Sequence, residues 1–251
     1  MGGHADLTVV ADPEALAEAA AQAIVDTAAR AVAARGRFTL VLAGGATPRV
    51  TYERLAAPPF RDRMPWPRTW VFFGDERAVP PEHPESNYGM ARQALLSRVP
   101  IPPEQVVRFP AEAEDPEAAA TEYARALATA FASRRGEVPR FDLVLLGLGV
   151  DGHTASLFPG SPVLKEIFRP VAAVYAAAAA VPQRLTLTLP VLNAAARVIF
   201  LVAGAEKAKV VRAVLAEKAP LPAAMVQPKE GELIWLVDRA AAALLPGADG
   251  G

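Results

Sequence analysis

The sequence predicts an α/β protein with a mainly parallel sheet that helices cover on both faces. Two observations carry this prediction: short, continuously apolar segments recur along the chain, and alanine-rich or amphipathic helical segments separate them. Strands that are apolar throughout are typical of parallel sheets, because helical crossovers bury both faces of the sheet. The 251 residues, 52% hydrophobic and 21% charged, can bury a substantial core.

The expected elements follow one another in regular order. A short strand at 7–10 precedes a helix that Asp12 caps and Pro13 begins, and Gly36 is placed to end it. After a strand at 37–43, a glycine pair leads into a second helix. The later expected elements are a strand at 69–73, a polar loop at 74–86, a helix near 87–97, a helix opening at Asp115, and strands at 141–146, 184–189, 198–203 and 233–237.

The chain shows no linker, internal repeat or compositional break, so a single domain over 1–251 is expected. The tails 1–6 and 247–251 are expected to be disordered. The start lacks the basic and apolar pattern of a secretory signal. The longest apolar run, 171–181, is shorter than the roughly 20 residues that a membrane-spanning helix needs. A cytoplasmic protein is therefore expected.

Composition narrows the possible partners. A formal net charge of -1 gives no reason to expect nucleic acid or an anionic membrane. The absence of cysteine excludes disulfides, thiol nucleophiles and zinc-thiolate sites. No second histidine lies at ligand spacing from His153, so no metal site is expected. A small molecule is the expected partner, and the chain is expected to be a monomer or a weak homodimer.

Four loops are the expected place of a ligand. In open α/β sheets, ligands bind beyond the carboxyl ends of the strands. That rule selects the loops that follow Ala43, Phe73, Leu146 and Ala203. Most of the residues that could take part in binding or catalysis lie in these loops.

The first of these loops contains Gly44, Gly45 and Thr47 at the start of a helix. Glycines let backbone amides approach an anion, the threonine hydroxyl adds a donor, and the helix N-terminus favours negative charge. The loop therefore suits a phosphate on a small ligand. A plain βα turn with a threonine cap is the alternative interpretation.

The second loop begins with three charged residues, Asp75, Glu76 and Arg77, directly after a strand. They are candidates for acid/base chemistry and for orienting an anion. Their place at the ligand edge favours function over the alternative, a solvated loop whose surface ion pairs contribute little. Ser86 is placed to cap the helix that follows.

The third loop contains Asp151 and His153. A histidine with an ordinary pKa of about 6.5 can take a proton from water near neutral pH. A carboxylate two residues away can orient the imidazole ring. This pair is therefore the candidate general base with its orienting acid, and a helix-capping histidine is the alternative.

Two isolated bases complete the candidate site. Arg184 begins an alternating strand, and Lys207 lies at the start of a helix, where a cation is locally unfavourable unless an anion binds. Each base alone is more often a surface charge. Together with the Gly44 loop they would form a phosphate pocket.

A glycine pattern in the third loop suggests a different ligand and is rejected. Gly147, Gly149 and Gly152 match GxGxxG after a strand, as in dinucleotide-binding folds. That site needs a long helix from the third glycine, yet 159–162 reads Pro-Gly-Ser-Pro. The ribose-binding acid expected about 20 residues later is also missing. No nucleotide cofactor is therefore expected.

With these residues identified, the chain resembles the 6-phosphogluconolactonase family from the Gly44 loop to Asp238. The stretch DGHTASLFPG at 151–160 is highly specific, whereas the Gly44 loop alone is not. The segments that carry the resemblance are LAGGATP (42–48), FFGDERAVP (72–80), SNY (86–88), FDLVLLGLGVDGHTASLFPG (141–160), RLTLTLP (184–190), GAEKAKV (204–210) and ELIWLVDRAAA (232–242).

The resemblance implies a Rossmann-like three-layer αβα sandwich with a mainly parallel sheet, shared with glucosamine-6-phosphate deaminases and ribose-5-phosphate isomerases. It implies hydrolysis of 6-phospho-D-glucono-1,5-lactone to 6-phosphogluconate, a step of the oxidative pentose phosphate pathway, without a cofactor. By resemblance, the phosphate-binding residues are Gly44, Gly45, Thr47, Arg184 and Lys207, and the residues around the sugar ring are Asp75, Arg77, Asp151 and His153.

Two rival functions remain. The deaminases have a motif resembling DGHIAFNEPG, whose glutamate assists ring opening, and this chain has Phe158 at that place. Phenylalanine cannot transfer protons, which favours the lactonase. A non-catalytic sugar-phosphate sensor is disfavoured, because the few residues before the first strand leave no room for a DNA-binding helix-turn-helix.

Overall fold

A six-stranded parallel sheet forms the centre of the protein in the computed structural model, which describes residues 5–132, 137–177 and 179–246. Its strands are β1 (Ala5–Val10), β2 (Phe38–Leu42), β3 (Thr69–Phe73), β5 (Leu143–Leu146), β8 (Arg197–Val202) and β9 (Glu232–Asp238). They lie in the spatial order β1-β9-β8-β5-β2-β3, and every neighbouring pair is parallel. The carboxyl ends of these strands therefore share one edge, which confirms the predicted α/β fold.

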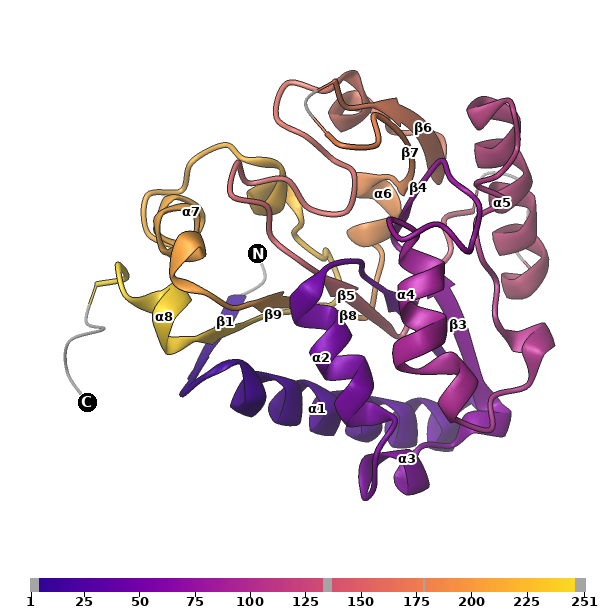
Figure 1. Ribbon diagram of the computed structural model, residues 1–251, viewed down its shortest axis with the longest axis horizontal. Coiled ribbons are helices and arrows are strands. Elements are labelled where there is room, and N and C mark those ends of the chain that lie inside the picture. Colours follow the sequence, from indigo (N-terminus) through magenta and orange to yellow (C-terminus); the bar gives the residue numbers. More distant parts are fainter. Residues whose placement is uncertain (1–4, 133–136, 178, 247–251) are drawn as a thin grey trace.

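Helices cover both faces of this sheet. They are α1 (Pro13–Arg35), α2 (Ala46–Leu55), α3 (Phe60–Arg63), α4 (Asn87–Ala94), α5 (Pro116–Phe131), α6 (Leu189–Leu192), α7 (Ala208–Leu215) and α8 (Arg239–Ala242). Figure 1 shows α1 along one face, with α5 and α6 on the opposite side. No helix in the described part of the chain is long and apolar enough to cross a bilayer.

The helix ends form as the sequence predicts. The Asp12 carboxylate accepts a hydrogen bond of 2.8 Å from the Ala15 amide and caps α1. Asp115 caps α5 in the same way, through a 2.9 Å bond from the Glu117 amide. Gly36 ends α1 in the left-handed region, at φ 75°, where a glycine has no steric penalty.

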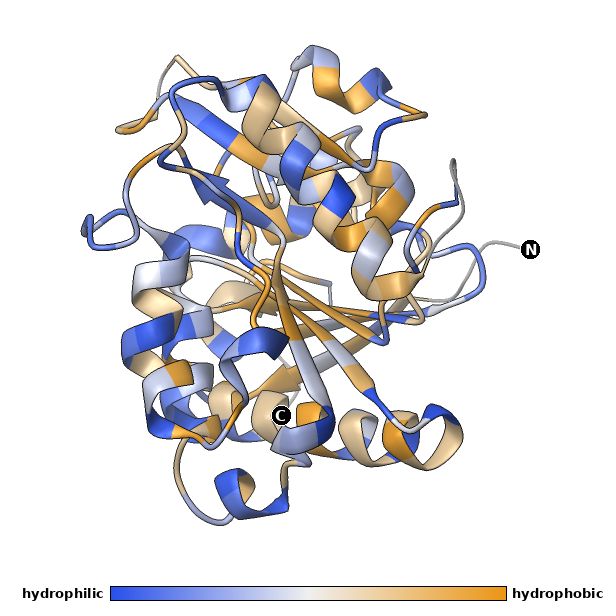
Figure 2. Ribbon diagram, turned by 90° about the vertical axis from the view of Figure 1, so that its right-hand side faces the viewer, coloured by the Kyte–Doolittle hydropathy of each residue, from blue (hydrophilic) through white to orange (hydrophobic). Residues whose placement is uncertain are grey.

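The core lies between the sheet and its helices. Figure 2 shows the strands as a mainly hydrophobic layer with helices on either side. Phe200 of β8 stacks on Trp235 of β9, with ring centroids 4.0 Å apart and nearly parallel planes. Both side chains are buried, and full burial of a large apolar side chain contributes about 1.5–3 kcal/mol to folding.

A second sheet of three antiparallel strands was not predicted. It consists of β4 (Asp75–Arg77), β7 (Gln183–Leu187) and β6 (Val171–Tyr175), in the order β4-β7-β6. Two expectations are therefore wrong: 74–86 is not loop throughout, and the strand at 184–189 does not join the parallel sheet. The reason is that β4 pairs with a strand more than a hundred residues later, a contact that no local pattern signals.

Two smaller expectations also need correction. Residues 5 and 6 do not belong to a disordered tail, because Ala5 and Asp6 pair with Leu233 and Ile234 of β9. The expected helix near 87–97 ends at Ala94, and a 3₁₀ turn follows it. Residues 1–4 and 247–251, the remaining tail expectations, lie outside the described residues.

Candidate active site

A cavity of about 300 Å³ opens at the carboxyl edge of the parallel sheet, where the ligand rule places it. The loops after β2, β3, β5 and β8 all contribute to it, and so does β7 of the second sheet. The predicted residues on its wall are Gly44, Gly45, Thr47, Asp75, Arg77, His153, Arg184 and Lys207. The remaining one, Asp151, lies behind His153.

A buried tyrosine anchors the glycine loop through hydrogen bonds to the residue that precedes it. The Tyr52 hydroxyl accepts a 2.8 Å bond from the Ala43 amide and donates a 2.7 Å bond to the Ala43 carbonyl. Burial raises the pKa of Tyr52, so it stays protonated and keeps both bonds. A side chain on Gly44 would collide with Asn87, whose amide oxygen lies 2.0 Å from the position a Cβ would take. The loop therefore has a fixed shape and requires glycine at 44.

The N-terminus of α2 faces this cavity with its amides available. Gly45 precedes the helix at φ 105°, and no side chain caps the first turn. The first turn also contains no acidic residue. Thr47 adds its hydroxyl to the cavity wall. Uncapped amides and a helix dipole together favour an anion such as a phosphate.

His153 is oriented by Asp151 within one tight turn. Asp151 Oδ1 lies 2.6 Å from His153 Nδ1 and accepts a 3.1 Å bond from the His153 amide. Partial burial works against ionisation of Asp151, but the hydrogen bonds from His153 outweigh it and hold the pKa of Asp151 below its ordinary value. An ionised Asp151 accepts a hydrogen bond from Nδ1–H of His153, which leaves Nε2 as the basic nitrogen.

Gly149 makes room for the His153 ring. A Cβ at 149 would lie 2.0 Å from Nδ1 of His153 and 2.2 Å from its Cε1. The Gly149 amide donates a 2.8 Å bond to the His153 carbonyl, and its own carbonyl accepts from Gly152. Gly152 lies at φ 84° and is followed by no helix through residue 161, so the nucleotide-type glycine pattern serves here as a tight turn.

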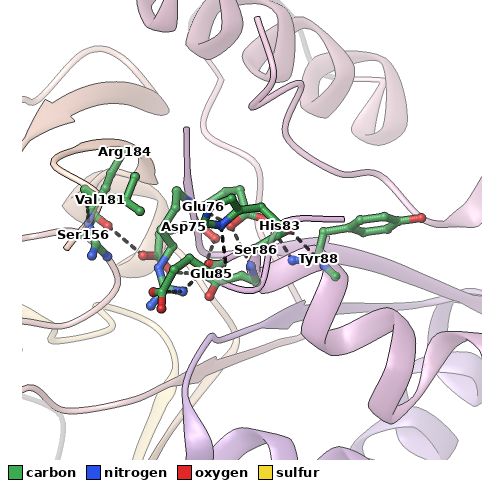
Figure 3. A network of polar contacts seen from close by, with 12 residues as sticks. Asp75, Glu76, His83, Glu85, Ser86, Tyr88, Ser156, Val181 and Arg184 are labelled. Carbon is green, nitrogen blue, oxygen red and sulfur yellow. Dashed lines mark hydrogen bonds and ion pairs between the residues drawn. The ribbon is translucent and has the colours of Figure 1, made fainter. Parts of the chain in front are cut away.

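Asp75 is buried and links three segments (Figure 3). Its Oδ2 accepts a 2.7 Å bond from the Ser156 hydroxyl, and its Oδ1 accepts a 3.1 Å bond from the side-chain nitrogen Nδ2 of Asn87. Strand β4, helix α4 and the loop after His153 therefore meet at one carboxylate. With both oxygens engaged, Asp75 organises the wall of the cavity.

Glu76 is buried beside it and fixes the N-terminus of α4. Its carboxylate accepts from the amides of Arg77, Asn87 and Tyr88 at 2.7–2.8 Å, and from the Ser86 hydroxyl at 3.1 Å. Burial raises the pKa of Glu76, and these amide bonds oppose the rise. The predicted cap is confirmed, because the Ser86 hydroxyl also accepts from the Gly89 amide at 3.0 Å.

Arg77 and Arg184 lie directly opposite each other on the paired strands β4 and β7. Like charges in this position destabilise a sheet unless an anion balances them. Burial lowers the pKa of Arg184, and the nearby Arg77 adds to that effect while Asp75 opposes it. Arg184 Nε donates a 3.0 Å bond to the Val181 carbonyl. Arg77 Nη1 binds the Glu85 carbonyl, whereas its buried Nε has no partner within the described chain.

Lys207 comes from the loop after β8. The Gly204 amide donates to both carboxylate oxygens of buried Asp238, at 3.1 Å each, and Gly204 adopts φ 104°. The chain then turns so that the Lys207 amide bonds the Gly204 carbonyl at 3.0 Å. The Lys207 ammonium, at the N-cap of α7, makes no ion pair with any residue that the structure describes. Its charge is available to a ligand.

Three contributors were not identified as site residues from the sequence. Asn87 lines the cavity, Ser156 is the partner of Asp75, and Phe158 packs against both His153 and Arg184. Asn87 and Ser156 are polar but carry no distinctive spacing. The position of Asn87 directly after the cap of α4 is the one local signal that could have placed it near the site.

Comparisons with known proteins identify the family of the chain. The family model described as glucosamine-6-phosphate isomerases/6-phosphogluconolactonase matches residues 11–235. A 6-phosphogluconolactonase of Synechocystis is 43% identical over 236 residues, covering 93% of this chain and 95% of the relative. The Homo sapiens 6-phosphogluconolactonase is 44% identical over 243 residues, covering 95% of this chain and 93% of the relative.

A solved structure gives the same result in three dimensions. The 6-phosphogluconolactonase from Trypanosoma cruzi superimposes with a TM-score of 0.86 at 30% identity, covering 98% of both chains. The sequence match and the structural match both extend over nearly the whole chain. The protein therefore belongs to the glucosamine-6-phosphate isomerase/6-phosphogluconolactonase family.

Proposed function

We propose that this protein hydrolyses 6-phospho-D-glucono-1,5-lactone to 6-phosphogluconate, the second step of the oxidative pentose phosphate pathway. The observation that carries the proposal is the pairing of two unlike features in one cavity. One is an imidazole oriented by a carboxylate, and the other is a glycine loop at an uncapped helix N-terminus with a free lysine. A neutral carbonyl and a phosphate on one small molecule match the two features.

The phosphate belongs at the basic end of the cavity. The first-turn amides of α2, the Thr47 hydroxyl and the Lys207 ammonium supply donors and positive charge. Arg184 adds a buried guanidinium from β7. Binding a phosphate at a distance from the reacting carbon positions the lactone ring for attack, which lowers the entropic part of the barrier.

The ester chemistry belongs to His153. Its Nε2 removes a proton from water, and the water oxygen attacks the lactone carbonyl carbon. The tetrahedral intermediate then breaks the bond between that carbon and the ring oxygen. His153, now protonated and still held by Asp151, returns its proton to the ring oxygen. The acid and the hydroxyl of the product are formed without any further reactant.

The negative charge that develops on the carbonyl oxygen needs donors. Arg77 lines the cavity, and its guanidinium has five N–H donors. Its Nη1 bonds the Glu85 carbonyl and lies 3.6 Å from the Glu85 carboxylate, and its buried Nε has no partner within the described chain. Backbone amides at Gly44 and Gly45 are the other candidates. Donors already in place at the oxyanion stabilise the transition state more than the ground state.

Deamination of an amino sugar phosphate is the rival reaction on this fold. Ring opening of an amino sugar needs a proton-transferring acid beside the histidine. Phe158 occupies the place next to His153, with ring centroids 4.5 Å apart, and it has no proton to transfer. Hydrolysis of the lactone needs no such acid, so the residues present favour the lactonase.

The proposal is tested by a pH-stat or coupled assay on freshly prepared 6-phosphogluconolactone, corrected for spontaneous hydrolysis. Glucosamine 6-phosphate is assayed alongside. We expect rapid acid release from the lactone and no ammonia from the amino sugar. Ammonia release without lactone hydrolysis would reverse the assignment.

The proposal extends to the organisation of the chain. Both sheets contribute residues to the one cavity, which favours a single catalytic domain over 1–251. It also includes a cytoplasmic location and a monomer or a weak homodimer in solution. Light scattering after size-exclusion chromatography tests the assembly state.

A further inference from the structure

The aromatic ring of Phe158 lies close to two chemically distinct groups of the cavity. The His153 imidazole is 4.5 Å away between ring centroids, at an interplanar angle of 34°. The Arg184 guanidinium carbon is 5.6 Å from the same ring centroid. A single apolar side chain thus contacts both the candidate base and a candidate phosphate-binding residue.

The segment that carries this ring is tied to its surroundings on several sides. Ser156 bonds Asp75 of β4 through its hydroxyl and Thr186 of β7 through its amide, at 2.7 and 3.3 Å. The buried side chain of Leu157 anchors the segment in the core. The ring position is therefore set by the fold and not by His153 or Arg184.

We propose that Phe158 is a positioning residue that sets the plane of the His153 ring and the place of the Arg184 guanidinium relative to each other. The inference rests on the lactonase function proposed above. It adds a specific role to a residue that is chemically inert in the reaction itself.

The need for such a residue follows from the hydrogen bonds. Asp151 fixes one atom of the imidazole, Nδ1, and a single bond of this kind leaves the ring free to tilt about it. Arg184 is likewise held within the described chain by one bond, from Nε to Val181. A flat aromatic face against each group supplies the second constraint. The ring also attracts the guanidinium electrostatically.

The consequence for the reaction is geometrical. The reacting carbonyl and the phosphate belong to one substrate, so the distance between the base and the phosphate-binding residues must match that substrate. A misplacement of about 1 Å at a reacting centre can cost roughly a hundredfold in rate. Phe158 couples the two ends of the site, and its removal should affect both turnover and binding.

The test uses Phe158→Leu, which keeps an apolar side chain and removes the flat face. We expect kcat to fall about tenfold to a hundredfold and KM to rise severalfold. The matched control is Phe109→Leu, which removes a buried ring stacked on Tyr123 away from the cavity. That control should lower the melting temperature and leave kcat within about twofold of the parent, because core truncation acts on stability.

A double-mutant cycle distinguishes positioning of His153 by Phe158 from a general loosening of the active site. In a His153→Ala background, Phe158→Leu should have little further effect on kcat, since the base it positions is gone, while the rise in KM through Arg184 persists. Equal proportional losses of kcat in both backgrounds would overturn the proposal. So would a kcat for Phe158→Leu within twofold of the parent.

A spectroscopic measurement on the wild-type protein covers the case in which the variant does not fold. The His153 ring protons should show an upfield ring-current shift and a nuclear Overhauser contact to the Phe158 ring. Their absence would overturn the inference whether or not the lactone is hydrolysed. Conversely, failure of the wild-type protein to hydrolyse the lactone, with these signals present, would contradict the proposed function and leave the contact intact.

Discussion

Ser156 donates a 2.7 Å hydrogen bond to the buried carboxylate of Asp75, and this bond joins the loop that carries His153 to strand β4. The two residues are 81 positions apart in the sequence. The same Asp75 carboxylate also accepts from Asn87 at the start of α4. One charged group therefore links the segments that form the wall of the cavity. Substituting its hydrogen-bond partners tests this role.

Replacing Ser156 with Ala leaves Oδ2 of Asp75 without its donor. A buried acceptor that loses its partner costs about 1–3 kcal/mol, so the free energy of unfolding should fall by that amount. We expect kcat to fall as well, because the His153 loop loses an anchor. Urea unfolding and steady-state kinetics measure both, with exposed Ser97→Ala as the control. Unchanged stability and turnover would show that the bond is dispensable.

Replacing Gly149 with Ala places a Cβ 2.0 Å from Nδ1 of His153. The His153 ring and the Asp151 carboxylate, whose Oδ1 would lie 2.7 Å from that Cβ, must shift. We expect kcat to fall at least about tenfold, since general-base catalysis depends on their geometry. Gly74→Ala is the control, because its Cβ would meet nothing closer than 3.6 Å. Equal kinetics for the two variants would contradict the assigned orientation of His153.

Replacing Lys207 with Ala removes the cation that has no ion pair within the described chain. One charge-assisted hydrogen bond to a phosphate is worth about 1.5–3 kcal/mol, so KM should rise roughly tenfold to a hundredfold. The phosphate is bound alike in the ground and transition states, and kcat should change much less. Exposed Lys209 on α7 supplies the control variant Lys209→Ala. A selective loss of kcat would place Lys207 at the reacting carbon instead.

Replacing Asp151 with Asn keeps an acceptor for His153 and removes its charge. The bond to a charged acceptor exceeds a neutral one by about 1–1.5 kcal/mol, so we expect kcat to fall about tenfold. A wild-type rate in the variant would show that the charge of Asp151 is not needed.

Stability measurements give a second readout of the same carboxylate. The pKa of Asp151 is lower in the folded protein than in the unfolded chain, where it is about 3.9. Ionised Asp151 therefore stabilises the fold above that unfolded-state pKa, and the contribution disappears as the pH falls through the lower folded-state pKa. Relative to Asp151→Asn, the stability advantage of the wild-type protein should be larger at pH 7 than at pH 3, as measured by urea unfolding. An advantage that is independent of pH would contradict the lowered pKa.

The sequence predicts the ligand edge well because that edge follows from local signals. The segments that contain Gly44, Asp75 and His153 each begin directly after an apolar strand, and parallel strands bring such segments to one edge. Helix caps such as Asp12 are equally local, because the capping oxygen and its amide are three residues apart.

The second sheet could not be predicted from local sequence patterns. The three residues of β4 have no apolar alternation, and their pairing with β7 depends on contacts across more than a hundred residues. Arg184 was therefore predicted as a site residue on the wrong sheet. The sequence indicates Asp75 only as a charged loop residue. Its burial follows from the same long-range pairing. The sequence singles out Phe158 only as a residue that cannot transfer protons, and its contacts with His153 and Arg184 become visible only in the fold.

The central claim is that His153 is the base that activates water. The direct measurement is kcat on 6-phosphogluconolactone for His153→Ala, corrected for spontaneous hydrolysis, with His83→Ala as the control. Positioned proton transfer contributes about 10²- to 10⁴-fold, so kcat should fall by that factor, while the circular dichroism spectrum and melting temperature stay close to those of the parent. A correctly folded His153→Ala protein that turns over the lactone at a near-normal rate would contradict the account.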